Sequence, residues 1–304
     1  MVFNTLFPVF AMILMGRLLK LTGFTGQEFF KNADRLVYYI FFPCMLFWKI
    51  GGASADALPD PSLPFAALCA VMLVFSITTL FIAFTGVPDF QAGTFSQSCY
   101  RFNTYIGLAI VLNAQGEAGV VTFGILAGFL IPVINVLSIS ILIWFSGRNY
   151  SSRARFARLL KALLSNPLIV ACISGIIFSR LGLFFPPAID NFFRMISMVT
   201  LPLALLSIGS TFSFAAVRGN IALSVVSALF KMGMLPLAGL LFMIHFGVTG
   251  ESFKTGLIFF CLPTSTAIYV LSSQMNSDTE LAAASIVFST MMSIFSLSMV
   301  LSIM

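Results

Sequence analysis

Long apolar runs separated by short polar connections are the main pattern of this sequence. A helix that spans a membrane needs about 20 mostly apolar residues, and its backbone groups must be paired inside the protein because lipid tails offer no partners. The pattern therefore predicts an all-α integral membrane protein with ten transmembrane helices. The predicted spans are 2–21, 36–51, 63–85, 94–113, 119–146, 166–183, 191–210, 221–246, 252–274 and 279–303. The first run lacks a basic leader and a cleavage site, so we expect it to remain as a helix.

The composition excludes a soluble globular protein. Hydrophobic residues make up 59% of the chain and charged residues 9%, whereas soluble domains carry roughly 25% charged residues. The net charge of +6 comes from basic residues that lie between apolar runs. This distribution is typical of membrane topology and not of nucleic-acid binding. The five cysteines lie inside apolar runs, where we expect small buried side chains rather than disulfides or metal ligands.

The connection 147–165 is the longest polar stretch and predicts the orientation of the chain. Short loops rich in Lys and Arg stay in the cytoplasm. We therefore expect this basic loop to be cytoplasmic, both termini to be extracytoplasmic, and the protein to lie in the cell (inner) membrane. Binding of lipid headgroups by the loop is compatible with that topology. Its basic residues are Arg148, Arg153, Arg155, Arg158 and Lys161.

A faint internal repeat divides the chain into halves 1–146 and 166–304. Each half would hold five spans, and this odd number forces the two halves into opposite orientations in the membrane. Inverted repeats are typical of secondary transporters. An offset of 160 residues relates Thr104 to Thr264. The pairs at an offset of 159 are Pro8 with Pro167, Gly16 with Gly175, Arg35 with Arg194, and Pro43 with Pro202.

The fourth span is the least apolar and holds Arg101, Asn103 and Thr104 at or near bilayer depth. An arginine at the centre of a bilayer costs about 2.5–3.5 kcal/mol, so it must face protein or water. Either Arg101 belongs to a binding site, or it makes a structural ion pair or extends toward the membrane surface.

The ninth span is interrupted by Pro263, which Thr264, Ser265 and Thr266 follow. The proline removes one backbone hydrogen bond. Interrupted helices at matching places in two halves indicate a binding site, where helix N-termini with free N–H groups favour anions. The alternative is a proline kink whose freed groups are capped by the hydroxyls.

Polar residues elsewhere in the spans are candidate walls of that site: Asn135, Lys231, Ser289 and Thr290. Lys231 either compensates charge beside the site or extends to the cytoplasmic surface, and we expect the second. The other three are equally typical of hydrogen bonds between helices. The sequence has no phosphate-binding loop, no HExxH motif, no Cys/His cluster and no paired carboxylates in a span. We therefore expect no enzyme, no metal and no cofactor.

Five motifs in this order resemble the auxin efflux carrier family, within the wider group that includes bile acid–sodium symporters. The resemblance covers essentially the whole chain. It implies that helices 4 and 9 are broken and cross at the site, and that helices 1, 2, 6 and 7 form a scaffold. Helices 3–5 and 8–10 would form a moving transport bundle. The motifs are Asn103-Thr-Tyr-Ile-Gly107, Ser165-Asn-Pro-Leu-Ile169, Pro202-Leu-Ala-Leu-Leu-Ser-Ile-Gly209, Leu262-Pro-Thr-Ser-Thr266 and Ala284-Ser-Ile-Val-Phe-Ser-Thr290.

The resemblance also implies transport of organic anions, such as auxin in plants and malate or malonate in bacteria, and a homodimer. Many relatives carry a proline just after the glycine of helix 4, where this chain has Leu108 and Ala109. An asparagine of the plant carriers near the helix 9 crossover is also absent. The resemblance therefore favours carboxylates other than auxin and a softer break in helix 4.

The sequence thus predicts a secondary active transporter of small carboxylates that works by alternating access. We expect coupling to protons rather than sodium, with membrane lipid and the anion as partners. A sodium-coupled symporter of the bile acid type and a non-transporting membrane sensor are the alternatives. The predicted substrate-binding residues are Arg101, Asn103, Thr104, Gly107, Pro263, Thr264, Ser265 and Thr266.

Overall fold

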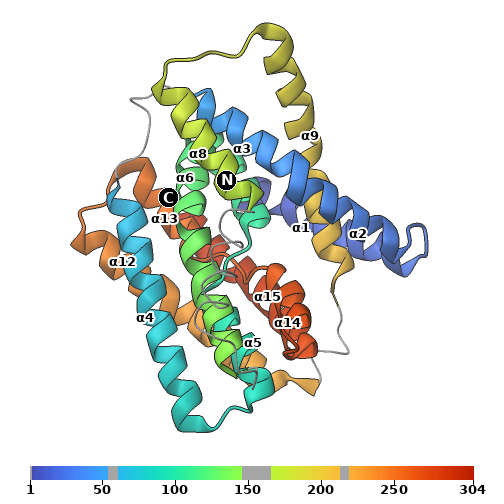
Figure 1. Cartoon of the computed structure of the whole chain (residues 1–304), viewed down its shortest axis with the longest axis vertical. Coiled ribbons are helices and arrows are strands. Elements are labelled where there is room, and N and C mark those ends of the chain that lie inside the picture. The colour runs from blue at the N-terminus through green and yellow to red at the C-terminus, as the bar shows by residue number, and fades with distance from the viewer. Residues whose placement is uncertain (1, 54–60, 146–165, 213–218) are drawn as a thin grey trace. The chain divides into compact units, whose positions relative to one another are not determined.

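The computed structural model describes residues 2–53, 61–145, 166–212 and 219–304 (Figure 1). Every regular element in these ranges is helical. Six helical segments of the described chain are long and apolar enough to cross a membrane. They are Val2–Leu21, Ser62–Thr85, Asp89–Phe145, Pro187–Ser210, Ile221–His245 and Thr279–Ile303.

The chain forms two compact units, each assembled from separate stretches of sequence. Unit 1 comprises Met1–Asp60, Tyr105–Phe129 and Leu164–Thr211. Its elements are α1 (Val2–Leu21), α2 (Gln27–Leu36), the π-helical turn η1 (Val37–Phe41), α3 (Phe42–Gly51), part of α6 (Thr104–Phe145), α8 (Pro167–Arg180) and α9 (Pro187–Ser210).

Unit 2 comprises Pro61–Thr104, Leu130–Leu163 and Phe212–Met304. Besides the remainder of α6, it contains the elements that follow. They are α4 (Ser62–Thr85), α5 (Asp89–Tyr100), α11 (Ile221–Leu229), the π-helical turn η3 (Phe230–Met234), α12 (Leu235–His245), α13 (Gly250–Phe260), α14 (Ala267–Gln274) and α15 (Thr279–Ile303).

Each of the ten predicted spans overlaps a helix, and three features explain why only six segments have the length of a span. The predicted fourth span is divided between α5 and α6, and its second part runs together with the predicted fifth span in α6, where the backbone leaves helical geometry only at Gly116 (φ 67°, ψ −153°). The predicted ninth span is divided between α13 and α14. The predicted second and sixth spans correspond to the short helices α3 and α8.

The expectation that residues 22–35 are only a connection was wrong, because α2 occupies most of them. Phe30 and Ala33 are buried one turn apart, while the charged residues Glu28, Lys31 and Arg35 are exposed. One apolar stripe on an otherwise polar helix is too weak a signal for a span, but it suffices for a helix that packs on a neighbour. In unit 1 that neighbour is α9.

Close approach of helices at glycine organises unit 1. A side chain at Gly16 of α1 would collide with the backbone carbonyl of Leu206 in α9. A side chain at Gly175 of α8 would lie 3.2 Å from the carbonyl oxygen of Phe47 in α3. The contact at Gly16 leaves no room for a larger residue, and the contact at Gly175 is tight. The helices α1 and α3 are therefore held against α9 and α8, respectively.

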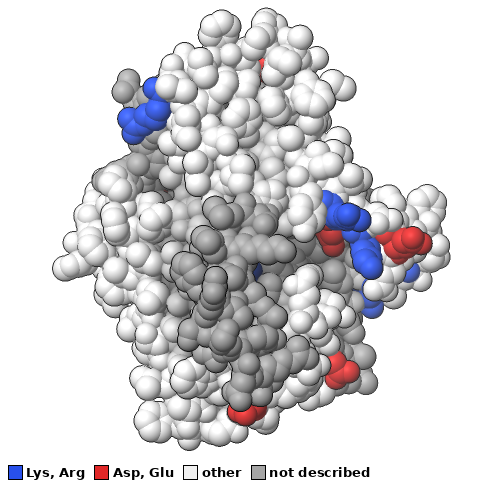
Figure 2. Space-filling view, viewed as in Figure 1, with Lys and Arg blue, Asp and Glu red and all other residues white. Residues whose placement is uncertain are grey.

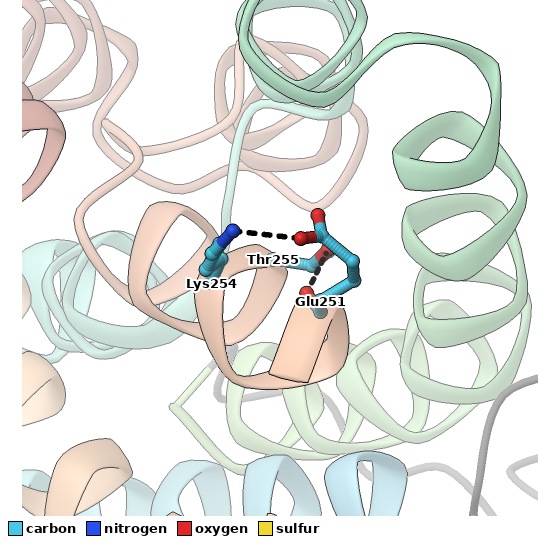
Figure 3. Close-up of polar contacts among 3 residues, drawn as sticks. All are labelled: Glu251, Lys254 and Thr255. Atoms are coloured by element: carbon cyan, nitrogen blue, oxygen red, sulfur yellow. Dashed lines mark hydrogen bonds and ion pairs between the residues drawn. The ribbon is translucent and has the colours of Figure 1, made fainter. Parts of the chain in front are cut away.

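In unit 2, α4 packs along α12, and α15 packs against α5, α11 and α14 (Figure 1). Gly239 of α12 accommodates the ring of Phe260, and Gly93 of α5 accommodates Leu142 of α6. At the start of α13, Lys254 forms an ion pair with Glu251 at 2.7 Å, and the Thr255 hydroxyl donates to the Glu251 carbonyl (Figure 3). This ion pair is exposed and lies outside the packed interior.

Each π-helical turn is followed by one residue and then by a proline. Pro43 occupies the first turn of α3 after η1, and Pro236 occupies the first turn of α12 after η3. Proline has no N–H to donate, and its ring crowds the preceding carbonyl, so the turn before it widens. The same local cause therefore explains both irregular turns.

Charged residues are sparse on the face shown in Figure 2. Large apolar side chains are exposed in both units, including Phe184 at 81% and Phe295 at 79%. Contiguous apolar surface of this kind is stable in lipid and unstable in water. The described chain thus has the surface of an integral membrane protein.

Candidate functional site

The helix that begins with α5 is interrupted after Tyr100. Arg101 is extended (φ −67°, ψ 150°), and α6 begins at Thr104. Arg101 and Asn103 are nevertheless buried, at 7% and 1% exposure. The interruption therefore places a cationic and an amide side chain inside the protein.

The second interruption lies between α13 and α14, at Cys261–Thr266. The Leu262 N–H donates to the Phe259 carbonyl at 3.3 Å, in the tighter pattern of a 3₁₀ turn. The Cys261 carbonyl accepts from the hydroxyl of Ser296 on α15 at 3.2 Å. Carbonyls at the end of α13 are thus satisfied within the chain, as a buried helix end requires.

The two interruptions contact each other through one backbone hydrogen bond. The N–H of Asn103 donates to the carbonyl of Pro263 at 2.9 Å. These two residues are separated by 160 positions (263 − 103), which is the offset of the sequence repeat at Thr104 and Thr264. The contact therefore joins residues that correspond in the two halves of the sequence.

Arg101 is held by Asn135, one of the predicted site walls. Its Nη2 donates to Oδ1 of Asn135, on the part of α6 that belongs to unit 2, at 3.0 Å. A hydrogen bond to a charged group contributes about 1.5–3 kcal/mol. Because the guanidinium is buried, the alternative that Arg101 extends to the surface is wrong.

Thr264 presents a hydroxyl in the same region. The residue is fully buried, and its Oγ1 finds no hydrogen-bond partner among the described residues. Its backbone N–H donates to Oγ of Ser289 on α15 at 3.2 Å, so this predicted wall also contacts the interruption. A buried hydroxyl without a hydrogen-bond partner is costly, so Thr264 is a candidate for contact with a ligand.

The N-terminus of α14 differs from the expectation of free N–H groups. Ala267 N–H donates to the hydroxyl of Ser265 at 3.3 Å, and the next two N–H groups donate to the carbonyls of Ser265 and Thr266. The Ser265 hydroxyl and the two carbonyls therefore satisfy the first three N–H groups of α14. An anion at this end would meet the helix dipole and the hydroxyls rather than these three N–H groups.

Lys231 lies in the π-helical turn η3 and is fully buried. The expectation that it extends to the cytoplasmic surface is therefore wrong. Its Nζ finds no hydrogen-bond partner among the described residues. The titratable groups within electrostatic range of its amine are Cys261, at the interruption after α13, and Cys99, two residues before Arg101.

The remaining predicted residues are less directly engaged. Thr290 donates its hydroxyl to its own helix, at the Ile286 carbonyl (2.7 Å). Thr104 and Thr266 are half-buried at the starts of α6 and α14. Gly107 is buried one turn into α6 and belongs to unit 1. Unit 2 thus contains every predicted site residue except Gly107.

Sequence reasoning missed a buried hydroxyl network next to the first interruption. Thr94 bonds to Ser272 at 2.7 Å and to Ser277 at 2.9 Å, and Gln97 Nε2 donates to Ser272 at 3.1 Å. These bonds join α5 to α14 and the residues that follow it. Nothing in the spacing of Ser and Thr along the sequence identifies such pairs, since they are more than 170 residues apart.

A groove of about 530 Å³ lies elsewhere, in unit 1, between α3, α8 and α9. Pro43, Phe47, Pro167 and Phe193 contribute to its walls, which include no charged side chain. An apolar groove without a charge is suited to a lipid chain and not to a small anion. We therefore place no anion site there.

The five cysteines are free, as expected. Cys99, Cys172 and Cys261 are buried, and Cys44 and Cys69 are half-buried. The cysteines are thus packing residues and not disulfide partners.

Comparison with known proteins identifies the family. The sequence profile of the family described as "Membrane transport protein" matches residues 1–301. The chain belongs to this family, the auxin efflux carrier family. It is also 23% identical over 299 residues, covering 97% of this chain and 95% of its relative, to a protein of Methanothermobacter thermautotrophicus described as "Uncharacterized transporter". Membership and the apolar helices together make the chain a multi-pass membrane transport protein.

Proposed function

We propose that this protein is a secondary active transporter of small organic anions, which it moves by alternating access. The anion binds where Arg101–Asn103 meets Cys261–Thr266. The observation that carries the proposal is the Asn103–Pro263 hydrogen bond, which joins an interruption that holds a buried arginine to one that holds a fully buried threonine hydroxyl with no hydrogen-bond partner among the described residues. A cation and hydroxyl donors at depth are the groups that recognise a carboxylate.

Matching contacts support an inverted five-plus-five repeat. Gly16 of α1 abuts the Leu206 carbonyl, and Gly175 of α8 abuts the Phe47 carbonyl. Adding the repeat offset of 159 to 16 and to 47 gives 175 and 206. The contacts Gly16–Leu206 and Phe47–Gly175 thus join corresponding positions, with the roles of the two halves exchanged. A two-fold relation between the halves would produce such a pair of contacts. Two halves that exchange conformations provide outward and inward access.

The helices that each unit contains support different roles for the two units in transport. Unit 1 contains α1, α3, α8 and α9, which correspond to helices 1, 2, 6 and 7. Unit 2 contains the crossover residues, except Gly107, and all of α11 to α15. We assign the scaffold to unit 1 and the transport bundle to unit 2, with Tyr105–Phe129 counted in unit 1.

The orientation rests on the basic connection 147–165, which lies outside the described residues. We propose that it is cytoplasmic, that both termini are extracytoplasmic, and that the protein resides in the inner membrane as a homodimer. A single cysteine placed in this connection, in a variant without its native cysteines, would report the orientation. We expect it to react with an impermeant maleimide in inverted membrane vesicles but not in intact cells.

Sodium coupling is the second candidate. The network of Thr94, Gln97, Ser272 and Ser277 offers neutral oxygens, and Gln97 Oε1 is buried without a hydrogen-bond partner among the described residues. Sodium binds such oxygens, but the hydroxyls here already pair with one another. For that reason we rank proton coupling first.

Uptake into liposomes tests the proposed function. Purified protein would be reconstituted and offered labelled acetate, lactate, malonate and malate under an imposed proton gradient, sodium gradient or membrane potential. We expect saturable uptake of at least one acid, driven by the proton gradient. Saturable uptake driven by sodium alone would instead establish the second candidate.

Variants locate the site in the same assay. Arg101→Gln and Thr264→Val should lower kcat/KM at least tenfold, since each removes a group that holds the carboxylate. Thr78→Val is the matched control, because Thr78 is fully buried in α4 and bonds only to its own helix at the Phe75 carbonyl. If no acid is taken up by folded wild-type protein, the carboxylate assignment is wrong. If the control loses as much activity as Thr264→Val, the site is misplaced.

A further inference from the structure

The amine of Lys231 is the most unusual buried group in unit 2. It is fully buried, and its Nζ has no hydrogen-bond partner among the described residues. An isolated ammonium in such a place costs several kcal/mol. Two events relieve this cost: the amine releases its proton, or an anion arrives beside it.

The position of Lys231 makes the second event available. Cys99, two residues before Arg101, and Cys261, at the end of α13, both lie within electrostatic range of its amine. Ser296 links the neighbouring residue to the same place, because its hydroxyl donates to the Cys261 carbonyl at 3.2 Å and contacts Sδ of Met232 at 3.8 Å. The turn η3 is therefore linked to the second interruption through Ser296, and the amine lies within electrostatic range of a residue near each interruption.

The sequence repeat allows the positive charges of the two halves to be compared. Adding the offset of 160 to Arg101 gives position 261, so Cys261 corresponds to the arginine of the first half. The second half has no charge at that position but has Lys231 beside it. Arginine stays charged under all ordinary conditions, whereas the charge of a lysine amine is reversible. The two halves thus provide one fixed and one reversible positive charge.

The helices packed around η3 provide no described carboxylate that pairs with the amine of Lys231. The helices that pack against η3 are α4, α5, α11, α12 and α15. The titratable or charged residues on these helices, besides Cys99, are Cys69, Asp89, Tyr100, His245 and Glu280, and none of these five is among the groups that act on the amine of Lys231. No carboxylate among the described residues pairs with the lysine, so a bound anion would be the partner that its charged form lacks there.

We infer that Lys231 carries the proton that is co-transported with the anion: the amine takes up a proton as the carboxylate enters the crossover, and releases it to the side on which the carboxylate leaves. No covalent bond changes, and water on each side supplies or accepts the proton. The widened turn η3 gives the lysine side chain room to follow the ligand. This inference rests on the proposed function, because it requires an anion at the crossover.

Proteoliposomes separate coupled transport from exchange. Labelled malate and malonate, which leak slowly through lipid, would be used in two assays: accumulation driven by a proton gradient, and exchange of labelled for unlabelled acid at equal pH. Exchange needs no net proton movement. For Lys231→Arg, whose charge is fixed, we expect the ratio of proton-driven accumulation to exchange to fall at least tenfold relative to wild type.

Two further variants are measured in the same two assays. Lys231→Met should show the same fall in this ratio and a higher KM for exchange, since the bound anion lacks its partner. Lys254→Met is the matched control, because Lys254 is exposed and forms an ion pair with Glu251 (Figure 3), and it should behave as wild type. A ratio within twofold of wild type in Lys231→Arg or Lys231→Met would overturn the inference.

Calorimetry on the wild-type protein provides a test that needs no variant. Binding of malate or malonate in detergent, in two buffers of different ionisation enthalpy, reports the number of protons taken up. We expect about one proton per acid bound. Binding without proton uptake overturns the inference but leaves the proposed function intact. If wild-type protein neither binds nor moves any acid, both fail.

Discussion

The hydrogen bond between Ser289 and Thr264 allows a quantitative test of how the second interruption is held. Ser289→Ala removes the acceptor of the Thr264 N–H, which lies in a fully buried residue. Leaving a buried donor unsatisfied costs about 1–3 kcal/mol. The bond is 3.2 Å long, near the upper limit for this type, so we expect the lower part of that range, about 1–2 kcal/mol.

The assay is thermal unfolding in detergent, with all variants scanned at one rate. One kcal/mol corresponds to about 2–4 °C in Tm for a protein of somewhat smaller size, so Ser289→Ala should lower the Tm by about 2–8 °C. Transport should also weaken, with a higher KM, because the loop that carries the Thr264 hydroxyl becomes less ordered in the binding conformation.

Ser293→Ala is the matched control on the same helix. Ser293 is fully buried, but its hydroxyl donates only to the Thr290 carbonyl of its own helix at 2.7 Å. Alanine removes that bond without leaving an unpaired backbone donor, and it favours the helix. We expect a change of less than about 2 °C. Equal Tm values for the two variants would refute the assignment of a structural role to the Ser289–Thr264 bond.

Three further predictions concern packing and the crossover. Gly16→Ala should lower the yield of folded protein in size-exclusion chromatography, because the methyl group collides with the α9 carbonyl that Gly16 touches, whereas Gly219→Ala, with open space around it, should not. Ser272→Ala should lower the Tm because its two partners on α5 lose a buried bond worth about 1–3 kcal/mol in total, whereas Ser76→Ala, exposed on α4, should leave the Tm unchanged. Pro263→Ala should raise the Tm and slow the exchange of labelled acid, because alanine supplies the N–H that proline lacks.

Apolar runs made the helices of this protein predictable, since hydrocarbon length and backbone pairing act on every span in the same way. Both interruptions were also visible as polar residues or proline in an apolar context. The amphipathic helix α2 was missed because its buried stripe is only Phe30 and Ala33. A pattern so short does not distinguish a surface helix from a polar connection.

The side-chain partners within the site were not predictable. Arg101 is 34 residues from Asn135, and Thr264 is 25 residues from Ser289. Such pairs arise from the packing of helices, which the sequence does not encode in any periodic form. Lys231 illustrates the same limit, because a lysine near the end of an apolar run has the same sequence signature whether it reaches the surface or is buried.

The hydrogen bond between Asn103 and Pro263 shows how similar halves acquire different roles. If residues 103 and 263 correspond, a two-fold relation would allow two bonds, one from each N–H to the opposite carbonyl. Proline lacks an N–H, so only the bond from Asn103 forms. The second interruption is consequently tied by one bond instead of two, and it is the one that carries the unpaired Thr264 hydroxyl. The first interruption carries the fixed charge of Arg101. Under the proposed function, one half would supply the charge that attracts an anion, while the other would supply a segment that rearranges around it.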